Sequence, residues 1–444
     1  MRHRRLTILA AAIVAASLGT AGCSSSGGAA TNANGTVTVT FWQQKFEDYQ
    51  QKWFKENVDK FNASQTKVKV NYLVVPADTW AQKLKAAQAA GTQPDVATTN
   101  YGGIGSGVAS GQFAALDGLM PPAAFTDVKD NVKSFVTIKD KHYAYPMLVE
   151  PSTVLYYRTD LAKAAGLDPT NPPKTWDDLV TWATKLTAGK VKGMTIASVA
   201  ADLGWSSWGL QYNACGKLPL STDWSKAQAT DPCYTKLFTL YQTLFQKGLM
   251  PTTPKVGYAD ASPYGQGEVA MMADGSWAIG QLKTSFPAMI AKTAVAPFPS
   301  IDGDPSRTTA TLGGWSLTVD SKSKAKQQAA DFISYLLAGD PATMAGFFKL
   351  SGFSKFTVRT SVDQALSTDK DATSDPFMKV VADKIVPNGK AEPSYPFDVS
   401  LAFGTAIESA MKGKADVATA QQSANTAIDR VIQQQHLAGT NAGS

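Results

Sequence analysis

Residues 36–99 alternate between two hydrophobic periodicities, and this alternation restricts the fold more than any other feature of the chain. TVTVTF places apolar residues at every second position, which predicts a strand, whereas Trp53, Phe54, Val58 and Phe61 recur with helical spacing. The predicted elements in order are a strand at 36–41, a helix at 49–62, a strand at 67–75, a helix at 78–91 ending at Gly91, and a strand at 94–99. Strand–helix–strand alternation predicts an α/β fold with parallel strands.

Polar and aromatic residues follow two of these strands directly. Trp42, Gln43 and Gln44 follow the first strand, and Asn100 and Tyr101 follow the third. Because ligands of such sheets bind beyond the carboxyl ends of the strands, we expect both groups to line a binding site. The alternatives are a Trp packed between strand and helix, and a simple turn built on the glycines after Asn100.

Downstream segments continue the mixed pattern. Residues 142–157 hold two extended runs around Glu150-Pro151, and a capping pair, Thr175 with Asp178, predicts a helix start. We further expect a strand at 311–319, an amphipathic helix at 321–337, and a mainly helical C-terminal region.

The N-terminus has the pattern of an export signal over residues 1–22. A basic start precedes 13 apolar residues, too few to cross a bilayer comfortably, and small residues precede Cys23. This resembles a bacterial lipobox and predicts lipidation of Cys23, although Thr20 stands where Leu is usual; ordinary secretory cleavage near Ala21 is the alternative. Residues 23–35 read as a flexible tether, and no later stretch is apolar enough to span a membrane.

Charge and cysteine content narrow the function classes. Half of the net charge of +6 comes from three arginines in the first five residues, and no basic run marks a nucleic-acid surface. Cys215 and Cys233 remain as a pair if Cys23 carries lipid, and export favours a disulfide between them. The three histidines do not cluster with these cysteines, so we expect no metal site and no cofactor.

Several segments in this order resemble the extracellular solute-binding proteins of ABC importers, the family of the maltose-binding protein. They are the opening strand with Phe41-Trp42, QPDV (93–96), YAYPMLVEPSTVLYYRTDLAKAAGLDP, PPKTWDDL, GQGEVAMMADGSW and GGWSLTV. The resemblance implies a type II periplasmic-binding-protein-like fold, in which a hinge joins two lobes that are each a mixed sheet flanked by helices. The expected lobes are discontinuous and comprise residues 36–148 with 290–325, and 149–289 with 326–444.

The resemblance also implies ligand contacts. Glu150 stands where the family crosses between lobes and often places a ligand-binding carboxylate, and Trp277 where a Trp commonly stacks on a sugar. The other candidates are Trp205 or Trp208, Asp274, Gly314, Trp315 and Tyr395. The alternatives are an exposed hinge for Glu150, core packing for the tryptophans, and a surface loop for Tyr395.

The expected function is capture of a carbohydrate, without catalysis, by a monomeric lipoprotein on the outer face of the bacterial cytoplasmic membrane. Aromatic rings would stack on sugar faces while carboxylates and amides bind hydroxyls. The partners would be ABC permease subunits with an ATPase behind them, and no nucleic acid. Alternatives are a glycerol phosphoester or polyamine ligand on the same fold, and a secreted glycoside hydrolase, which needs two facing carboxylates.

Overall fold

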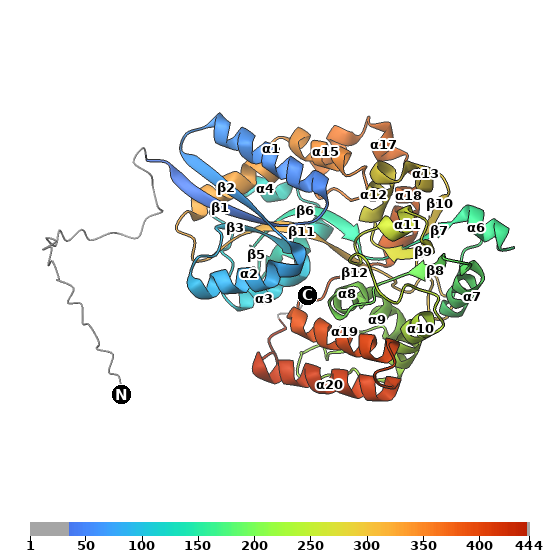
Figure 1. Ribbon diagram of the computed structural model, residues 1–444. Coiled ribbons are helices and arrows are strands. Elements are labelled where there is room, and N and C mark those ends of the chain that lie inside the picture. Colours follow the sequence, from blue (N-terminus) through green and yellow to red (C-terminus); the bar gives the residue numbers. More distant parts are fainter. Residues whose placement is uncertain (1–34, 442–444) are drawn as a thin grey trace, which may run out of the picture.

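The computed structural model describes residues 35–441, which form two lobes lying side by side (Figure 1). The expected signal peptide, the Cys23 lipidation site and the expected tether up to residue 34 lie outside the described residues. Within the described part, no helix is both long and apolar enough to cross a membrane.

The first lobe contains a six-stranded mixed sheet. β1 (Val37–Gln44) pairs in parallel with β2 (Val68–Val75) and β3 (Val96–Asn100), as the alternating sequence pattern predicts. β11 (Thr311–Val319) is antiparallel to β3 on one side and to β6 (Tyr145–Pro151) on the other, and β12 (Lys390–Ala391) pairs with its first residues. The expected mixed sheet is therefore confirmed.

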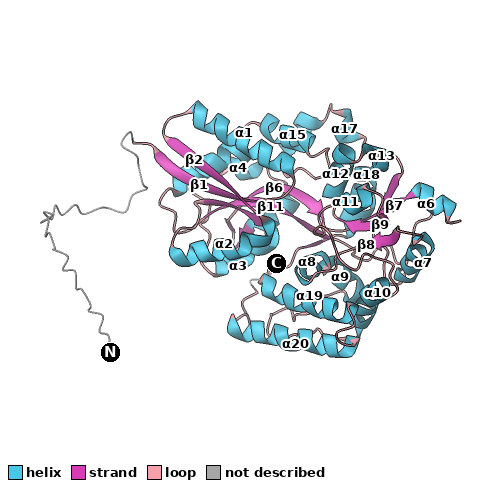
Figure 2. Cartoon of the chain, viewed as in Figure 1, coloured by secondary structure: helices cyan, strands magenta, loops and turns pink. Residues whose placement is uncertain are grey.

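Helices cover both faces of this sheet (Figure 2). On one face, Phe41 of β1 packs against Phe54 of α1 (Asp48–Ser64) and Phe332 of α14 (Lys326–Ile333), with ring centroids 5.3 and 5.5 Å apart. The other first-lobe elements are α2 (Ala77–Ala90), α3 (Tyr101–Ala109), α4 (Ala123–Thr126), α5 (Asp130–Val136), β4 (Thr137–Ile138), β5 (Lys141–His142), the π-helix η2 (Ser334–Ala338), α15 (Pro341–Leu350), α16 (Thr360–Leu366) and α17 (Lys370–Thr373).

The second lobe contains a four-stranded sheet in the order β10-β7-β9-β8. Its strands are β7 (Val154–Arg158), β8 (Lys192–Thr195), β9 (Val269–Asp274) and β10 (Thr293–Ala296). Its helices are α6 (Thr159–Ala164), α7 (Trp176–Leu186), α8 (Ala200–Ser206), α9 (Trp208–Cys215), η1 (Pro232–Tyr234), α10 (Thr235–Gln246), α11 (Ser262–Gly265), α12 (Trp277–Ser285), α13 (Pro287–Ile290), α18 (Pro376–Val380), η3 (Val381–Ile385), η4 (Val386–Asn388), α19 (Phe397–Met411) and α20 (Val417–Gln434).

The lobe boundaries differ from those expected at residues 148, 290 and 325. β6 remains in the first sheet as far as Pro151, whereas β10 pairs with β7 and so places residues 293–296 in the second lobe. Residues 326–366 bury Phe332, Phe347 and other apolar side chains in the first-lobe core rather than the second. The chain crosses between the lobes after β6, after β10 and after α17, and it returns briefly to the edge of the first sheet at β12 before α19.

Local sequence signals set several element ends. Thr175 and Asp178 form the expected capping box before α7, and Gly91 ends α2 in a left-handed conformation. The helix expected from residue 321 begins instead at Lys326. The side chains of Asp320 and Ser323 accept hydrogen bonds from the backbone N–H groups of residues 322 and 325, and these local bonds hold the preceding turn out of the helix.

The expected disulfide joins Cys215 at the end of α9 to Cys233 in η1. Because it closes a loop with a sequence separation of 18, replacing both cysteines with alanine should lower the free energy of unfolding by about 3 kcal/mol. Urea denaturation of the oxidised protein and of the variant tests this value. A reductant should destabilise the wild type and leave the variant unchanged; equal stability of the two oxidised proteins would contradict the prediction.

Candidate ligand-binding site

Buried charges gather where β6 leaves the first lobe. The Lys355 ammonium lies 2.9 Å from Glu47 Oε1 and 2.7 Å from Glu150 Oε2, and the Lys355 side chain is only 1% exposed. Burial raises the pKa of Glu150, and Lys355 opposes that shift. Burial by itself would lower the pKa of Lys355, but the charges of Glu150 and Glu47 hold it well above its usual value.

An aromatic pair lies beside these charges on the first lobe. The Phe46 ring packs on Trp315 with centroids 4.0 Å apart, and both rings are partly exposed. Phe46 comes from the connection between β1 and α1, whereas Trp315 lies in β11. The Trp315 indole also lowers the pKa of Glu150, and β11 pairs with β6 at these residues, so the aromatic pair adjoins the buried charges.

A second aromatic cluster, made of Trp205, Tyr258 and Trp277, lies on the second lobe. The centroid of Trp205 is 5.2 Å from that of Tyr258 and 6.1 Å from that of Trp277, and Trp205 and Tyr258 remain partly exposed. The Tyr258 hydroxyl donates to the backbone oxygen of Ser152, 3.1 Å away, in the connection between β6 and β7. The cluster therefore borders the same crossing as Glu150.

The turn between β9 and α12 holds polar atoms without partners. Asp274 Oδ1 accepts from the Gly275 N–H at 2.7 Å, but within residues 35–441 no hydrogen bond of regular geometry reaches Asp274 Oδ2, Ser276 Oγ or Trp277 Nε1. Burial raises the pKa of Asp274 well above its usual value. The Trp277 side chain lowers the pKa of Asp274, so these polar atoms lie together, and a ligand or bound water would complete their hydrogen bonds.

Glu392 lies where the two lobes meet. Its Oε2 accepts from the Gly102 N–H of α3 at 3.3 Å, and a Cβ on Gly313 would come within 2.0 Å of Oε1. Burial raises the pKa of Glu392 to about 7, with Glu150 adding to the rise. The carboxyl therefore changes charge near neutral pH at the junction of the lobes.

Glu392 should make stability pH-dependent. Because its folded-state pKa, about 7, lies above the ordinary 4.5, its contribution to stability is complete below pH 4.5 and is lost as the pH rises through 7. Relative to Glu392→Gln, the wild type should therefore lose stability between pH 4.5 and 8. Urea denaturation at both pH values measures this difference; a constant difference would contradict the prediction.

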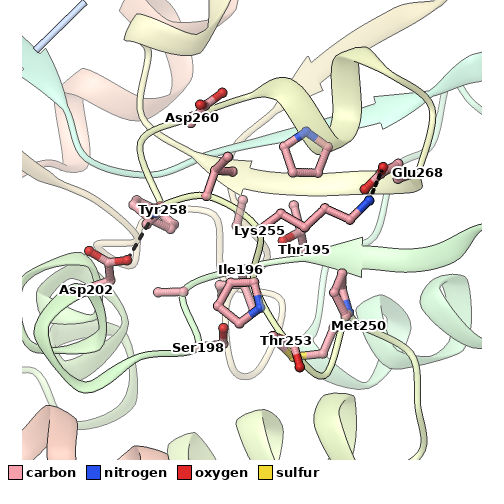
Figure 3. Close-up of a pocket in the computed structure, with 17 residues that line it drawn as sticks. Thr195, Ile196, Ser198, Asp202, Met250, Thr253, Lys255, Tyr258, Asp260 and Glu268 are labelled. Carbon is pink, nitrogen blue, oxygen red and sulfur yellow. Dashed lines mark hydrogen bonds and ion pairs between the residues drawn. The ribbon is translucent and has the colours of Figure 1, made fainter.

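A separate small cavity opens at the carboxyl end of β8 (Figure 3). On one side of it the Asp202 carboxylate accepts a hydrogen bond from the backbone N–H of Tyr258. On the other side Lys255 forms an ion pair with Glu268. Its volume is about 60 Å³, whereas sites for small ligands usually enclose at least about 300 Å³. The cavity adjoins the aromatic cluster of the second lobe but in this conformation is too small for a sugar.

The structure brings several predicted site residues to the crossing. On the first lobe these are Glu150 and Trp315. On the second lobe they are Trp205, Trp277 and Asp274. Of the residues at the end of β1, Trp42 and Gln44 are partly exposed, and Lys83 lies 5.2 Å above the Trp42 ring. Gln43 is buried on the opposite face, where its side-chain oxygen accepts from the Tyr72 hydroxyl, and no group in the described part of the chain bonds its amide nitrogen.

Three other predicted residues make structural contacts, and their ligand contacts stay predictions. Trp208 is buried and donates to Ser400 Oγ at 2.9 Å, and Tyr395 packs in the second-lobe core rather than in a surface loop. Asn100 caps α3 by accepting from the Gly103 N–H.

Two more candidates pack into the first lobe. The buried Tyr101 hydroxyl donates to the Leu148 oxygen. A Cβ on Gly314 would lie 2.1 Å from that same oxygen, so this glycine admits a neighbouring strand rather than a ligand.

Sequence reasoning missed Glu47, Lys355, Tyr258 and Glu392, and it leaves Phe46 undecided between cleft wall and core. Glu47 and Phe46 follow Trp42 closely, so the rule that ligands bind beyond strand ends could have included them. Tyr258, Lys355 and Glu392 lie in connections with no motif, and only the fold brings them to the crossing.

Comparisons with known proteins agree with this architecture. The family model described as bacterial extracellular solute-binding protein matches residues 12–340. A probable ABC transporter-binding protein of Deinococcus radiodurans is 30% identical over 232 residues, which are 48% of this chain and 52% of that relative. The chain thus spans about half the length of that relative.

Two further matches cover nearly the whole chain. The sn-glycerol-3-phosphate-binding periplasmic protein UgpB of Escherichia coli K12 is 25% identical over 90% of this chain and 92% of its own. The crystal structure of the cyclic alpha-maltosyl-1,6-maltose binding protein from Arthrobacter globiformis is 28% identical, with a TM-score of 0.66 over 90% of this chain and 100% of the other.

Proposed function

Because the chain belongs to the bacterial extracellular solute-binding protein family, we propose that it captures a carbohydrate between its lobes for an ABC importer. One observation carries the choice of ligand: partly exposed aromatic rings and buried carboxyls occur together on both sides of the crossing after β6. Sugars have apolar C–H faces and hydroxyl rims, which match such surfaces.

The two aromatic groups have complementary roles in this proposal. Phe46 and Trp315 offer a ring surface from the first lobe, and Trp205 with Trp277 offers one from the second. Closure about the connections between the lobes brings these surfaces onto the faces of a sugar. Glu150 and Asp274 then accept hydrogen bonds from ligand hydroxyls, and the Trp277 N–H donates one, so that polar atoms left without partners in Asp274 and Trp277 become satisfied.

We further propose that the protein is exported, anchored through lipid on Cys23 to the outer face of the cytoplasmic membrane, and active as a monomer. Permease subunits with their ATPase would receive the ligand. No catalytic step is needed for this role, since capture requires only desolvation and matched polar groups. The sequence pattern of residues 1–23 supports the anchor.

One alternative ligand has a specific observation in its favour. The relative UgpB is named for binding sn-glycerol 3-phosphate. Basic side chains commonly bind phosphate, yet Lys355, which is buried at the crossing, is already paired with two carboxylates. The charges at the crossing therefore favour an uncharged sugar over a phosphoester.

A ligand panel tests the proposal. Thermal-shift and tryptophan-fluorescence titrations with mono- and oligosaccharides, polyols, polyamines and sn-glycerol 3-phosphate should single out a carbohydrate, because a ligand that binds only the folded state raises the melting temperature. Incubating the protein with the same sugars should yield no cleavage product. If the folded protein responds to no carbohydrate, or responds only to a non-sugar solute, the proposal is wrong.

A further inference from the structure

We infer that Glu47, Lys355 and Glu150 form an anionic subsite of the proposed cleft, in which Glu47 contacts the ligand and Lys355 positions the two carboxylates. This inference rests on the proposed function and specifies, in addition, that the ligand is not anionic. The subsite binds hydroxyl or ammonium donors of a carbohydrate and rejects phosphate- or carboxylate-bearing solutes.

The three residues come from separate parts of the first lobe. Glu47 immediately precedes α1, Glu150 lies in β6, and Lys355 lies between α15 and α16. The adjoining Phe356 exchanges backbone hydrogen bonds with Val149, at 2.8 and 3.0 Å, which holds the Lys355 segment against β6. Lys355 therefore fixes the start of α1 relative to the strand that leads into the second lobe.

Burial differs among the three side chains, and this difference assigns their roles. The Lys355 side chain is 1% exposed and that of Glu150 is 9% exposed, whereas that of Glu47 is 23% exposed. Glu47 is thus the member that a ligand reaches first. Lys355 is too deeply buried to meet a ligand and acts through the carboxylates that it holds.

The charges of the subsite do not balance. One ammonium faces two carboxylates, so the group carries a net negative charge, and Glu392 lies close enough to Glu150 to raise its own pKa further. The neighbouring Lys45 is exposed and pairs with Asp48 at 3.4 Å. A ligand that brings hydrogen-bond donors gains from this field, and an anionic ligand is repelled by it.

A conservative change of the accessible carboxylate tests the contact. Glu47→Gln keeps the shape of the side chain and removes its charge, and should weaken binding of whichever neutral sugar the panel identifies by about tenfold or more. Asp59→Asn is the matched control, because Asp59 forms an exposed pair with Lys55 on α1, and should change affinity less than about twofold. Isothermal titration calorimetry measures all three proteins. If Glu47→Gln binds the sugar as tightly as the wild type, the subsite is wrong while the proposed function stands.

Charge selectivity tests the role of Lys355 without removing it. The single variant Glu47→Gln keeps Lys355 paired with Glu150 and removes the excess negative charge, so the ratio of affinities for glucose 6-phosphate over glucose should rise about tenfold or more above the wild-type ratio. A purely structural role would leave this ratio unchanged, and circular dichroism confirms folding. An unchanged ratio, or tighter wild-type binding of glucose 6-phosphate than of glucose, would overturn the inference. Failure of the wild type to bind any sugar would instead overturn the proposed function and the inference with it.

Discussion

Replacing Lys355 with Met should lower the free energy of unfolding at pH 7 by about 3–5 kcal/mol. Met has a similar length but no charge, so the substitution leaves Glu47 and Glu150 facing each other in a buried site without a cation. Two uncompensated carboxylates cost far more than a lost surface ion pair, which is worth at most about 1 kcal/mol. Urea denaturation followed by circular dichroism measures the loss.

The pH dependence of this loss identifies its cause. Burial already raises the pKa of Glu150 above its ordinary 4.5 in the wild type, and removing Lys355 removes a cause that lowers it. A carboxyl with a raised folded-state pKa contributes stability that is complete below its unfolded value and lost as the pH rises through its folded value. The deficit of Lys355→Met should therefore be smallest near pH 4.5 and grow toward pH 7.

A neutral triple variant is the control for this prediction. Lys355→Met/Glu47→Gln/Glu150→Gln removes all three charges and should recover much of the lost stability, because the two unpaired charges are gone. The stability deficit of Lys355→Met relative to the wild type could instead grow on acidification, or the triple variant could be no more stable than Lys355→Met. Either result would show that packing rather than charge causes the loss.

Replacing Trp205 with Ala should weaken sugar binding by about 2 kcal/mol, roughly thirtyfold, and lower the free energy of unfolding by only about 1 kcal/mol. Trp205 is partly exposed and lies at the edge of the aromatic cluster with Tyr258 and Trp277, so its ring is available to stack on a sugar. Calorimetric titration and urea denaturation of the same preparation separate the two effects.

Trp208, three residues along the chain, is the matched control. Its ring is 4% exposed and its N–H donates to Ser400 Oγ, so Trp208→Ala creates a cavity in the second lobe. The expected loss of stability is about 3–5 kcal/mol, with little change in the affinity of the folded fraction. If Trp205→Ala mainly lost stability and Trp208→Ala mainly lost affinity for the sugar, Trp205 would belong to the core and Trp208 to the site.

The local elements of this fold were predictable from sequence because they depend on short-range physics. The strand over 311–319 and the capping box at Thr175 have clear patterns of side chains and were both confirmed. The division into lobes was harder to predict, because residues 326–366 are amphipathic helices that fit either lobe by pattern alone. Tertiary packing, such as that of Phe332 on Phe41 and of Phe347 on Trp53, assigns that region to the first lobe.

The candidate site was likewise predictable from the sequence only in part. Trp315 and Glu150 were found because a family resemblance pointed to them, and both lie at the crossing. Lys355 could not be found, since its partners Glu47 and Glu150 are 308 and 205 residues away in sequence. Trp205 and Trp208 were indistinguishable by sequence, and only their different burial separates them.

The position of β11 has a consequence for how the chain is made. β11 lies between β3 and β6, and Ser316 hydrogen-bonds Thr99 across a separation of 217 residues. The first lobe therefore cannot complete its sheet until more than two thirds of the chain has been synthesised, and contacts of such long range form slowly. During synthesis the N-terminal strands therefore lack the strand that joins β3 to β6, and this sheet forms only after β11 has been made.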